Sequence, residues 1–479
     1  SRRSGGVKEQ ISMYKQQIEA YFADKEAMLV DAVTRLVSID SVEGGSAPGA
    51  PFGPGPAAAL DEALRLAGEW GLITHNHEGY VGTADLNDKP DALHILGHLD
   101  VVAPGEGWTV TQPYSPKLVD GMLFGRGVED DKGPVIASLL AMKAVKDLGV
   151  PLKANCRMIM GTNEESGSGD IAWYFARNPY APATFSPDAG FPVINTEKGG
   201  FKPTFSKSWP VQEQLPRLRW LHGGFRINVL PGDASAAVEG IAPADMVSFA
   251  RDIMVRTGIQ FSYSVENGLT VIHAKGTGSH AAWPEGGNNA ITGLVALLCA
   301  LPLADGPCKQ ALAQLNDLLP HGDCHGKALG IAQEEPVAGK LTVAFSLLEV
   351  TDTGLEGRFD SRVPLCATEE NCLNVARAAF EAQGFTFSGE QDKPHHTPSD
   401  SPFVQTLLHR YEQYTGLEGE CLSTGGGTYV HDIPGGVAFG CTLPGFDAHP
   451  HGADERIRVS DLMVSAKMFA HIILDLCAQ

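Results

Sequence analysis

The sequence predicts an α/β protein in which one domain is interrupted by a second domain of α+β type. A chain of 479 residues is too long for a single hydrophobic core, so two domains are expected. In the first part of the chain, short apolar runs alternate with helical periodicity, and each run ends at polar residues. Strand-like segments become frequent after Gly199-Gly200, and a helix-like pattern of apolar residues returns after Pro394.

The first part of the chain has the strand, helix, strand order of an α/β domain. One strand-like run, Leu93–Leu96, ends at Gly97-His98, and a second, Cys156–Met160, ends at Gly161-Thr162. This placement fits the rule that sites in α/β domains form at the carboxyl ends of strands. The helices expected around these strands are Ile11–Leu36, Ala57–Trp70 and Val135–Leu148.

The middle of the chain indicates an inserted α+β domain. A strand–helix–strand–strand order occurs twice, in about 224–300 and in about 340–390, which predicts a duplicated topology. We assign residues 1–199 and 394–479 to the outer domain, which includes a helix at Phe403–Tyr414, and residues 200–393 to the insert. The strands expected in the insert are Gly224–Val229, Gln260–Val265, Thr270–Lys275, Lys340–Glu349 and Thr353–Asp360, and its helices are Pro243–Thr257, Ala290–Ala300 and Glu369–Gln383.

Composition excludes several classes of partner. The formal net charge of −21, from 57 acidic and 36 basic residues, repels nucleic acid and anionic membranes. Nine scattered cysteines without a CxxC pair indicate free thiols in a reducing compartment, so we expect a cytoplasmic protein. No uninterrupted apolar run reaches the roughly 18 residues of a membrane helix. The stretch Ser1–Gly6 lacks the apolar core of a secretory signal.

His98 and Asp100 follow the first strand in an HxD pattern. A neutral imidazole is the commonest zinc ligand, and it binds best when a carboxylate holds its other ring N–H. The strand period of two places both side chains on one face. A surface histidine beside a solvated aspartate is the alternative interpretation of this tripeptide alone.

Three consecutive acids, Glu129, Asp130 and Asp131, lie between glycines immediately before a helix. Acidic side chains at the start of a helix interact favourably with the helix dipole, so a helix cap is the simplest interpretation. Three of them exceed what a cap requires, and one carboxylate could bridge two cations through its two oxygens.

Glu164 and Glu165 follow the second strand. Adjacent glutamates repel each other unless a positive charge lies between them. A metal held by one glutamate, with the other acting as general base on the metal-bound water, resolves the repulsion. An exposed Glu-Glu loop is the alternative.

Asp188 and His451, in Ser-Pro-Asp-Ala-Gly and His-Pro-His-Gly-Ala segments, complete a set of two histidines and three carboxylates. That set suits two zinc ions, and also manganese or cobalt. Because the set lacks cysteine, a structural zinc site is not expected.

Together, the HxD, GRGxxDxKG, EESG, PDxG and late HxxxE patterns closely resemble the co-catalytic dinuclear zinc peptidases. This family includes aminoacylase, succinyl-diaminopimelate desuccinylase and carnosinase, and the resemblance is strongest to bacterial dipeptidases of the peptidase V type. The resemblance covers essentially the whole chain. It implies a zinc-peptidase-like catalytic domain, with a mixed sheet flanked by helices, that is interrupted by an α+β lid domain of duplicated ferredoxin-like topology.

The resemblance also implies a role for each candidate residue. Asp130 would bridge the metals, and the DxKG pattern favours it over Asp131. The upstream His449 leaves a choice of histidine, which the HxxxE spacing settles in favour of His451. The family carries a cis peptide after the bridging aspartate, here Asp130–Asp131. The implied roles are one metal held by His98 and Asp188, the other by Glu165 and His451, Asp100 as the partner of His98, and Glu164 as the general base.

The insert resembles the family's lid, which contacts the substrate. His280, in Gly-Ser-His-Ala-Ala, matches the histidine that polarises the scissile carbonyl, and Asn228 matches a substrate-contacting asparagine. Arg362 matches the arginine that binds the free carboxylate of the substrate. Gly425 and Gly426 match a glycine-rich loop whose backbone N–H groups approach the peptide.

The implied function is a metal-dependent dipeptidase acting on dipeptides with a free carboxylate, of the carnosine type or of broad specificity. An N-acyl-amino-acid deacylase or a carboxypeptidase of the same family is the alternative. A non-catalytic relative is disfavoured because Glu164 and Asp130 are present, and a phosphoesterase because no basic phosphate clamp accompanies the acids. The cofactors expected are two divalent ions, zinc first, with manganese or cobalt as alternatives. The long, duplicated lid implies a monomer.

One further segment, His321-Gly322-Asp323-Cys324-His325, also contains metal-ligand residue types. Because it lies between helices of the insert, away from the strand-end motifs, we interpret it as a polar loop.

Overall fold

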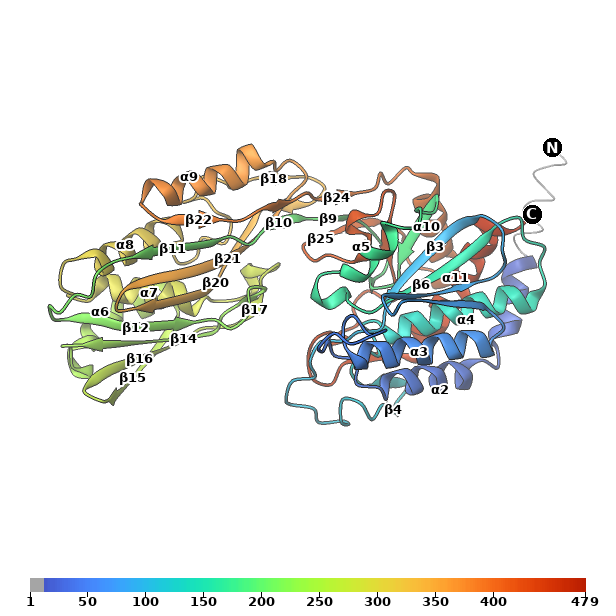
Figure 1. Ribbon diagram of the computed structural model, residues 1–479, viewed down its shortest axis with the longest axis horizontal. Coiled ribbons are helices and arrows are strands. Elements are labelled where there is room, and N and C mark those ends of the chain that lie inside the picture. Colours follow the sequence, from blue (N-terminus) through green and yellow to red (C-terminus); the bar gives the residue numbers. More distant parts are fainter. Residues whose placement is uncertain (1–12) are drawn as a thin grey trace. The chain divides into compact units, whose positions relative to one another are not determined.

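The computed structural model describes residues 13–479 and divides them into two compact units (Figure 1). Unit 1 contains the residues up to Thr196, His396–Leu422 and Gly427–Gln479. Unit 2 contains Glu197–His395 and the short segment Ser423–Gly426. The divisions at 196/197 and 395/396 lie close to the expected 199/200 and 393/394, but the segment with Gly425 and Gly426 lies in unit 2 instead of the outer domain.

A mixed sheet forms the centre of unit 1. Its order is β1-β2-β6-β3-β7-β26-β9-β24, with β25 also paired to β9. Strands β6, β3, β7 and β26 run parallel, while β1 and β2 are antiparallel to their neighbours and β9 is antiparallel to β26. The carboxyl ends of the parallel strands therefore meet at one edge. The strands are β1 (Ile73–His77), β2 (Val81–Asp85), β3 (Asp91–His98), β6 (Asn155–Gly161), β7 (Ala183–Ser186), β9 (Val193–Glu197) and β26 (Val437–Phe439).

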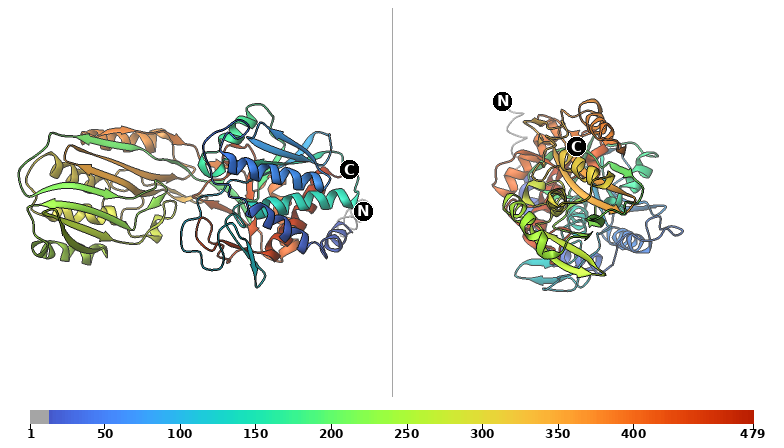
Figure 2. Two further views of the ribbon diagram at one scale, coloured as in Figure 1. Left: turned by 60° about the horizontal axis from the view of Figure 1, so that its bottom comes forward. Right: turned by 90° about the vertical axis from the view of Figure 1, so that its left-hand side faces the viewer.

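The central strands of unit 1 are buried on both faces. In β3, Ile95 belongs to the main core and Leu96 to a second cluster, and in β6 the same alternation separates Met158 from Ile159. Helices α4 and α11 pack on β3 and β6 over the main core, and α2, α3 and α4 lie side by side (Figures 1 and 2). The helices are α2 (Glu26–Val37), α3 (Pro54–Glu69), α4 (Lys132–Leu148), α5 (Gly169–Phe175), α10 (Pro402–Thr415) and α11 (Val459–Cys477).

Small strands organise the loops of unit 1. An antiparallel sheet has the order β28-β5-β4, and β27 pairs with β8. Unit 1 also has two short 3-10 helices. The first, η1 (Glu164–Ser166), comes after β6, and the second, η4 (Tyr429–Asp432), comes after β25. The bounds of the small strands are β4 (Lys117–Val119), β5 (Met122–Phe124), β8 (Ala189–Gly190), β27 (Cys441–Thr442), β28 (Arg456–Arg458), β24 (His395–His396) and β25 (Cys421–Thr424).

Unit 2 is built on one antiparallel sheet of order β15-β16-β14-β12-β20-β21-β10-β23, with β11 joining β21 to β22. A separate pair, β13 and β17, brings Val229 opposite His280. The strands are β10 (Gly199–Phe201), β11 (Thr204–Ser208), β12 (Arg217–Gly223), β13 (Val229–Leu230), β14 (Asp233–Glu239), β15 (Gln260–Glu266), β16 (Leu269–Lys275), β17 (Ser279–His280), β18 (Glu334–Glu335), β19 (Gly339–Lys340), β20 (Thr342–Thr351), β21 (Gly354–Val363), β22 (Thr386–Ser388) and β23 (Gln391–Asp392).

Helices of unit 2 pack on this sheet around a second hydrophobic core. Helix α6 begins at Pro243, which suits a first helical position, and ends at Gly258 in the left-handed conformation. Asn289 caps α7 by accepting hydrogen bonds from the backbone N–H groups of Ile291 and Thr292. The helices are α6 (Pro243–Thr257), α7 (Ala290–Ala300), α8 (Pro307–Leu318) and α9 (Asn374–Ala382), with a π-helical turn, η3 (Glu369–Leu373), before α9 and a 3-10 turn, η2 (Pro284–Gly286), before α7.

Several segments differ from the sequence-based expectation. The helix expected over Ile11–Leu36 is broken at 23–25 into helical residues 13–22 and α2, and Ile11 lies outside the described residues. The strand expected at Gly224–Val229 is wrong, because the strand ends at Gly223. Gly224 has φ +79, and a Cβ there would lie 1.8 Å from the carbonyl oxygen of Ser346. In 340–390 the order is β20, β21, α9, β22, so the helix follows two strands.

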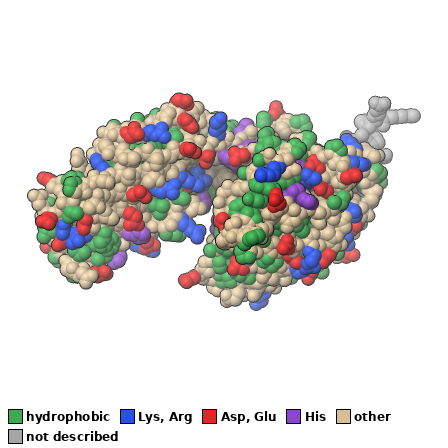
Figure 3. Space-filling model, viewed as in Figure 1, with side chains coloured by type: hydrophobic (Ala, Val, Ile, Leu, Met, Phe, Trp, Pro, Cys, Tyr) green, Lys and Arg blue, Asp and Glu red, His purple; other side chains and the backbone are tan. Residues whose placement is uncertain are grey.

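Two surface properties follow from the composition. Asp and Glu side chains are scattered over both units on the face shown in Figure 3, as the net charge of −21 leads one to expect. Within residues 13–479, no helix combines the length and the apolarity needed to cross a membrane.

Candidate metal centre

Three candidate residues lie where neighbouring parallel strands of unit 1 end. His98 is the last residue of β3, Glu164 begins η1 shortly after β6, and Asp188 follows β7. Because β6, β3 and β7 are adjacent and parallel, their carboxyl ends bring these side chains to the same edge of the sheet.

Two other segments of unit 1 reach the same edge. Asp130 lies just before α4, and His451 lies in the loop between β27 and β28. The antiparallel pairing of β28 with β5 brings these two segments together, and the backbone N–H of Gly125 donates to the carbonyl oxygen of Glu455 at 3.1 Å. The bond between Asp130 and Asp131 is a cis peptide, as the resemblance implies.

The buried imidazole of His98 is oriented at both nitrogens. Its Nδ1 donates to the backbone carbonyl oxygen of Asp100 at 2.9 Å, while the Asp100 carboxylate is 3.4 Å away. Its Nε2 is therefore the nitrogen that faces the carboxylates, 2.9 Å from Asp130 Oδ1 and 3.5 Å from Asp188 Oδ2, and the one a metal would bind. Glu164 Oε2 lies 3.8 Å from the same nitrogen.

His451 occupies the other side of Asp130. Its Nε2 lies 2.8 Å from Asp130 Oδ2 and 3.0 Å from Glu165 Oε1. One carboxylate oxygen of Asp130 thus faces His98, and the other faces His451. The ligand atoms form three groups, each with all members within 4.8 Å of one another: His98 with Asp130 and Asp188, His451 with Asp130 and Glu165, and His98 with Glu164 and Glu165.

Burial determines the charge balance of these side chains. Together with the charge of the nearby Asp130, it raises the pKa of Glu165 to about 8 and that of Asp188 to about 7. Burial and the charge of Asp188 raise the pKa of Glu164 well above its usual range. Burial opposes a charged His451, yet its hydrogen bonds to Asp130 and Glu165 raise its pKa to about 11. The carboxylates are crowded together in a buried space where a cation would stabilise them.

The donor set fits divalent cations. Every donor is an imidazole nitrogen or a carboxylate oxygen, the combination that zinc, manganese and cobalt accept. The hydrogen bond from His98 Nδ1 to a carbonyl oxygen is the outer contact expected of a ligating histidine. Asp130 belongs to two of these groups and turns a different oxygen toward each histidine, so it is placed to touch two ions.

The structure places the alternative residues elsewhere. Asp131 Oδ2 accepts from the backbone N–H of His98 at 3.2 Å, so this carboxylate is used on the backbone. His449 Nε2 lies 2.9 Å from Asp447, and its Nδ1 faces the carbonyl oxygen of Ala453. Glu129 accepts from Thr442 Oγ1 at 3.0 Å. Asp130 and His451 are therefore the members of these segments that reach the cluster.

Sequence reasoning missed the ion pair that holds the cluster's loops. Arg126 donates to Glu455 Oε1 at 2.7 Å, and both side chains are 1% exposed. Glu455 Oε2 accepts from the backbone N–H groups of Gly127, Glu129 and Asp130 at 2.9, 3.0 and 3.3 Å. Glu455 is the glutamate of the HxxxE pattern, but the pattern was used only to choose His451 over His449.

A second set of contacts holds the loop after β6. The Asp100 carboxylate accepts from the backbone N–H groups of Glu164 and Glu165 at 3.1 and 3.0 Å. Asp170 accepts from the backbone N–H of Thr162 and from the hydroxyl of Tyr429, whose ring packs edge-on against His98. Asp100 thus positions both glutamates as well as His98.

The lid candidates lie close to one another in unit 2. The backbone N–H of Ala281, next to His280, donates to the carbonyl oxygen of Asn228 at 2.9 Å. Arg362 Nη1 donates to the carbonyl oxygen of Gly425 at 2.8 Å, and its other nitrogens hold Asp360. A Cβ at Gly425 would lie 3.1 Å from that of Ala282, so this close approach favours a glycine. Gly426 donates its backbone N–H to Thr424 Oγ1 at 3.2 Å.

Comparisons with known proteins agree with one another. The model of Peptidase family M20/M25/M40 matches residues 94–475. The chain is 34% identical over 459 residues to a Bacillus subtilis (strain 168) protein named "Putative dipeptidase YtjP", covering 94% of this chain and 98% of that protein. It is 31% identical over 460 residues to the Beta-Ala-Xaa dipeptidase of Lactobacillus delbrueckii subsp. lactis, covering 95% and 97%. The structure of human carnosine dipeptidase 1 shares the fold, with a TM-score of 0.57 at 14% identity, covering 96% and 98%.

Proposed function

Because the chain belongs to Peptidase family M20/M25/M40 and is therefore a metallopeptidase, we propose that it is a dipeptidase. The proposed substrates are dipeptides with a free carboxylate, either of the carnosine type or of broad specificity. Two relatives with the names of dipeptidases match over almost their whole length, which supports this substrate class.

The observation that carries the proposal is the pair of donor groups that share Asp130. We propose that His98, Asp130 and Asp188 hold one divalent ion, and that Asp130, Glu165 and His451 hold the other. Zinc is the proposed metal, and manganese and cobalt suit the same donors. When bound, a pair of such ions supplies Lewis acidity that makes water more acidic and stabilises negative charge on the scissile carbonyl.

Glu164 is the proposed general base. Its carboxylate lies at the cluster, 3.8 Å from His98 Nε2, and burial favours a carboxyl that can hold a proton. It would accept a proton from the attacking water on an Oε atom and deliver it to the leaving amine. Asp100 would support this step by accepting hydrogen bonds from the backbone N–H groups of Glu164 and Glu165, which fixes the backbone at the base.

Unit 2 is proposed to bind the substrate. Arg362 would pair with the free carboxylate, and its bidentate contact with the buried Asp360 holds the guanidinium in place. His280 would donate to the carbonyl oxygen of the scissile bond, and the acceptance of the Ala282 N–H by its Nδ1 leaves Nε2 protonated for that purpose. Asn228, Gly425 and Gly426 complete the proposed substrate contacts.

A substrate panel tests the proposal. Zinc-loaded protein is assayed with β-Ala-His, Ala-Ala, Ala-Ala-Ala and N-acetyl-Ala, and release of free amino acid is measured. We expect the two dipeptides to be cleaved with the highest kcat/KM. Preference for N-acetyl-Ala would replace the proposal with an N-acyl-amino-acid deacylase, and successive release of C-terminal residues from longer peptides would replace it with a carboxypeptidase.

We also propose a cytoplasmic location. All nine cysteines, which lie within the described residues, are free thiols, and five of them are at least partly exposed to solvent. Such thiols persist in a reducing compartment.

A further inference from the structure

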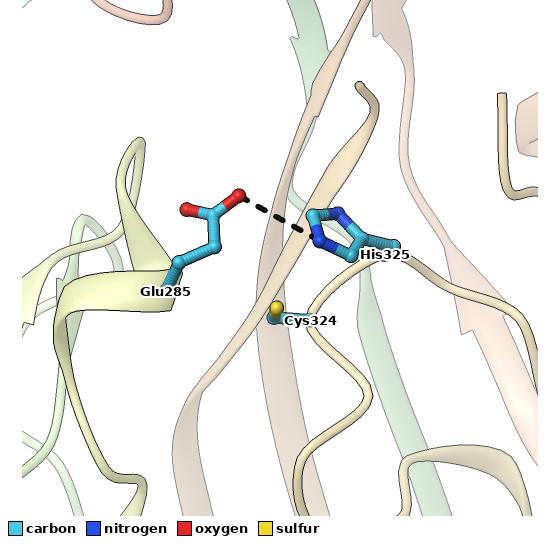
Figure 4. A group of neighbouring side chains, drawn as sticks. All are labelled: Glu285, Cys324 and His325. Carbon is cyan, nitrogen blue, oxygen red and sulfur yellow. Dashed lines mark ion pairs between the residues drawn. The ribbon is translucent and has the colours of Figure 1, made fainter. Parts of the chain in front are cut away.

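Unit 2 contains a second cluster of potential metal ligands, formed by Glu285, Cys324 and His325 (Figure 4). Glu285 belongs to η2, while Cys324 and His325 lie in the loop between α8 and β18. One ligand atom from each residue lies within 4.8 Å of the other two. In Figure 4 the carboxylate and the imidazole face each other, and the Cys324 sulfur is seen below the gap between them.

The imidazole of His325 has the orientation of a ligand. Its Nδ1 donates to the backbone carbonyl oxygen of Leu341 at 2.9 Å. A carbonyl oxygen can only accept, so Nδ1 carries the proton and Nε2 keeps its lone pair. This Nε2 points toward Glu285 Oε1 at 3.7 Å. Ligating histidines in metal sites are held by the same kind of outer hydrogen bond.

The loop is held in place by its backbone. The Asp323 carboxylate accepts from the backbone N–H groups of His325, Lys327 and Ala328 at 3.2, 3.1 and 2.9 Å. The carbonyl oxygen of Cys324 accepts from the N–H of Val343 in β20 at 2.8 Å. The segment therefore presents its sulfur and imidazole from fixed positions, in contrast to the polar loop expected from sequence.

The spacing suits one tetrahedral cation. Zinc bonds to nitrogen and oxygen at about 2.0–2.2 Å, so a nitrogen and an oxygen ligand of one tetrahedral ion are about 3.3–3.5 Å apart. The 3.7 Å between His325 Nε2 and Glu285 Oε1 is close to this separation, and the ligand atom of Cys324 lies within 4.8 Å of both. Glu285 and Cys324 also line a pocket of about 170 Å³, which gives a bound ion room for solvent in its fourth position.

We propose that Glu285, Cys324 and His325 form a binding site for a thiophilic divalent cation such as zinc, separate from the centre in unit 1. One thiolate, one imidazole and one carboxylate favour zinc or cobalt over magnesium or calcium. The thiol proton of Cys324 would pass to solvent when the ion binds. The inference does not depend on the proposed dipeptidase activity, since no residue of this site belongs to the unit 1 cluster.

Cobalt spectroscopy separates the two sites. The donors in unit 1 are all nitrogen and oxygen, so they give no thiolate-to-cobalt charge transfer. Full-length protein treated with a chelator is titrated with Co²⁺ while near-ultraviolet absorption is recorded. We expect a charge-transfer band in the wild type and in Cys366→Ser, which removes an exposed cysteine, and no band in Cys324→Ser. The absence of a band in the wild type, or its persistence in Cys324→Ser, would overturn the proposal.

Zinc content gives a second readout that does not depend on activity. Protein saturated with zinc and freed of excess metal is analysed by elemental mass spectrometry. The wild type should hold one more zinc per chain than Cys324→Ser and than His325→Ala. Equal zinc content in the wild type and both variants would contradict the site. A failure of the unit 1 centre would instead lower the zinc content of all three proteins equally.

Discussion

Glu164 and Glu165 are adjacent in sequence but differ in their surroundings. Glu165 Oε1 lies 3.0 Å from His451, whereas Glu164 Oε2 lies 3.8 Å from His98. The Asp100 carboxylate holds both backbone N–H groups, so the two side chains diverge from a fixed turn. This difference in contacts supports the proposal that Glu165 is a metal ligand and Glu164 the general base.

Replacement of Glu164 should abolish turnover without removing the metals. In Glu164→Gln we expect kcat to fall by about 10²–10⁴-fold, because the amide cannot accept the proton. Dipeptide hydrolysis and metal content are measured together, with Glu26→Gln on the exposed surface of α2 as the control. Retention of half the activity by Glu164→Gln would contradict its assignment as the base.

The two histidines of the late loop provide a matched pair. Loss of a residue that only hydrogen-bonds to a metal ligand typically weakens metal binding by about 10–100-fold. His451→Ala should weaken it by more than this, because the variant lacks a proposed ligand. His449→Ala should bind metal like the wild type, since His449 contacts Asp447 and Ala453. Equilibrium dialysis against zinc measures both. Equal losses in the two variants would show that the loop's conformation, and not one imidazole, is what matters.

Residue types predicted much of the cluster but not its detail. Strand-end positions made His98, Glu164 and Glu165 candidates, because the apolar runs that precede them are visible in the local sequence, whereas Asp188 was added only to complete the ligand set. The contact of the Asp100 carboxylate with two backbone N–H groups depends on the turn geometry after β6, which the sequence does not reveal.

At the scale of elements, the centre depends on two loops that are distant in sequence. Arg126 precedes α4 and Glu455 precedes β28, and their buried ion pair ties these loops together. The pairing of β28 with β5 creates this contact. No local pattern predicts such a pairing, so the HxxxE pattern could mark Glu455 but could not show that its partner is Arg126.

Breaking this pair should destabilise unit 1 strongly. Arg126→Ala leaves Glu455 buried and unpaired, and we expect a loss of about 3–5 kcal/mol in the free energy of unfolding. Urea unfolding followed by circular dichroism measures it. Arg65→Ala, which breaks contacts of an exposed arginine on α3, should leave the free energy of unfolding nearly unchanged. A similar small loss in both variants would show that the buried pair does not hold the loops.

Element prediction succeeded where local signals mark both ends of a helix. The expected bounds of α6 and α7 are those of the structure, because Pro243, Gly258 and the Asn289 cap mark their ends. Helix α8 was missed, although Pro307 lies at its start. The strand predicted at Gly224–Val229 is wrong because β12 ends at Gly223, where the backbone comes close to the carbonyl oxygen of Ser346.

At the scale of the whole molecule, the chain passes between the two units more often than the sequence suggests. Besides the divisions at 196/197 and 395/396, the segment Ser423–Gly426 belongs to unit 2. Its contacts with Arg362 and Ala282 join residues that are far apart in sequence. The composition change near Gly199 and Pro394 predicted the insert, but so short a segment has no compositional signal of its own.

We expect the protein to be a monomer in solution. Unit 2 contains one continuous antiparallel sheet from β15 to β23 within a single chain, so a second copy is not needed to extend it. Sedimentation velocity should give a mass near the 50.9 kDa of one chain. A species of twice that mass that persists on dilution would contradict this expectation.

The central claim is that Asp130 lies between two metal ions, and anomalous diffraction at the zinc edge tests it most directly. Crystals of the zinc-loaded protein should show one anomalous peak beside His98, Asp130 and Asp188, and another beside Asp130, Glu165 and His451. A single peak in this cluster, or no peak in contact with Asp130 at saturating zinc, would contradict the two-metal centre.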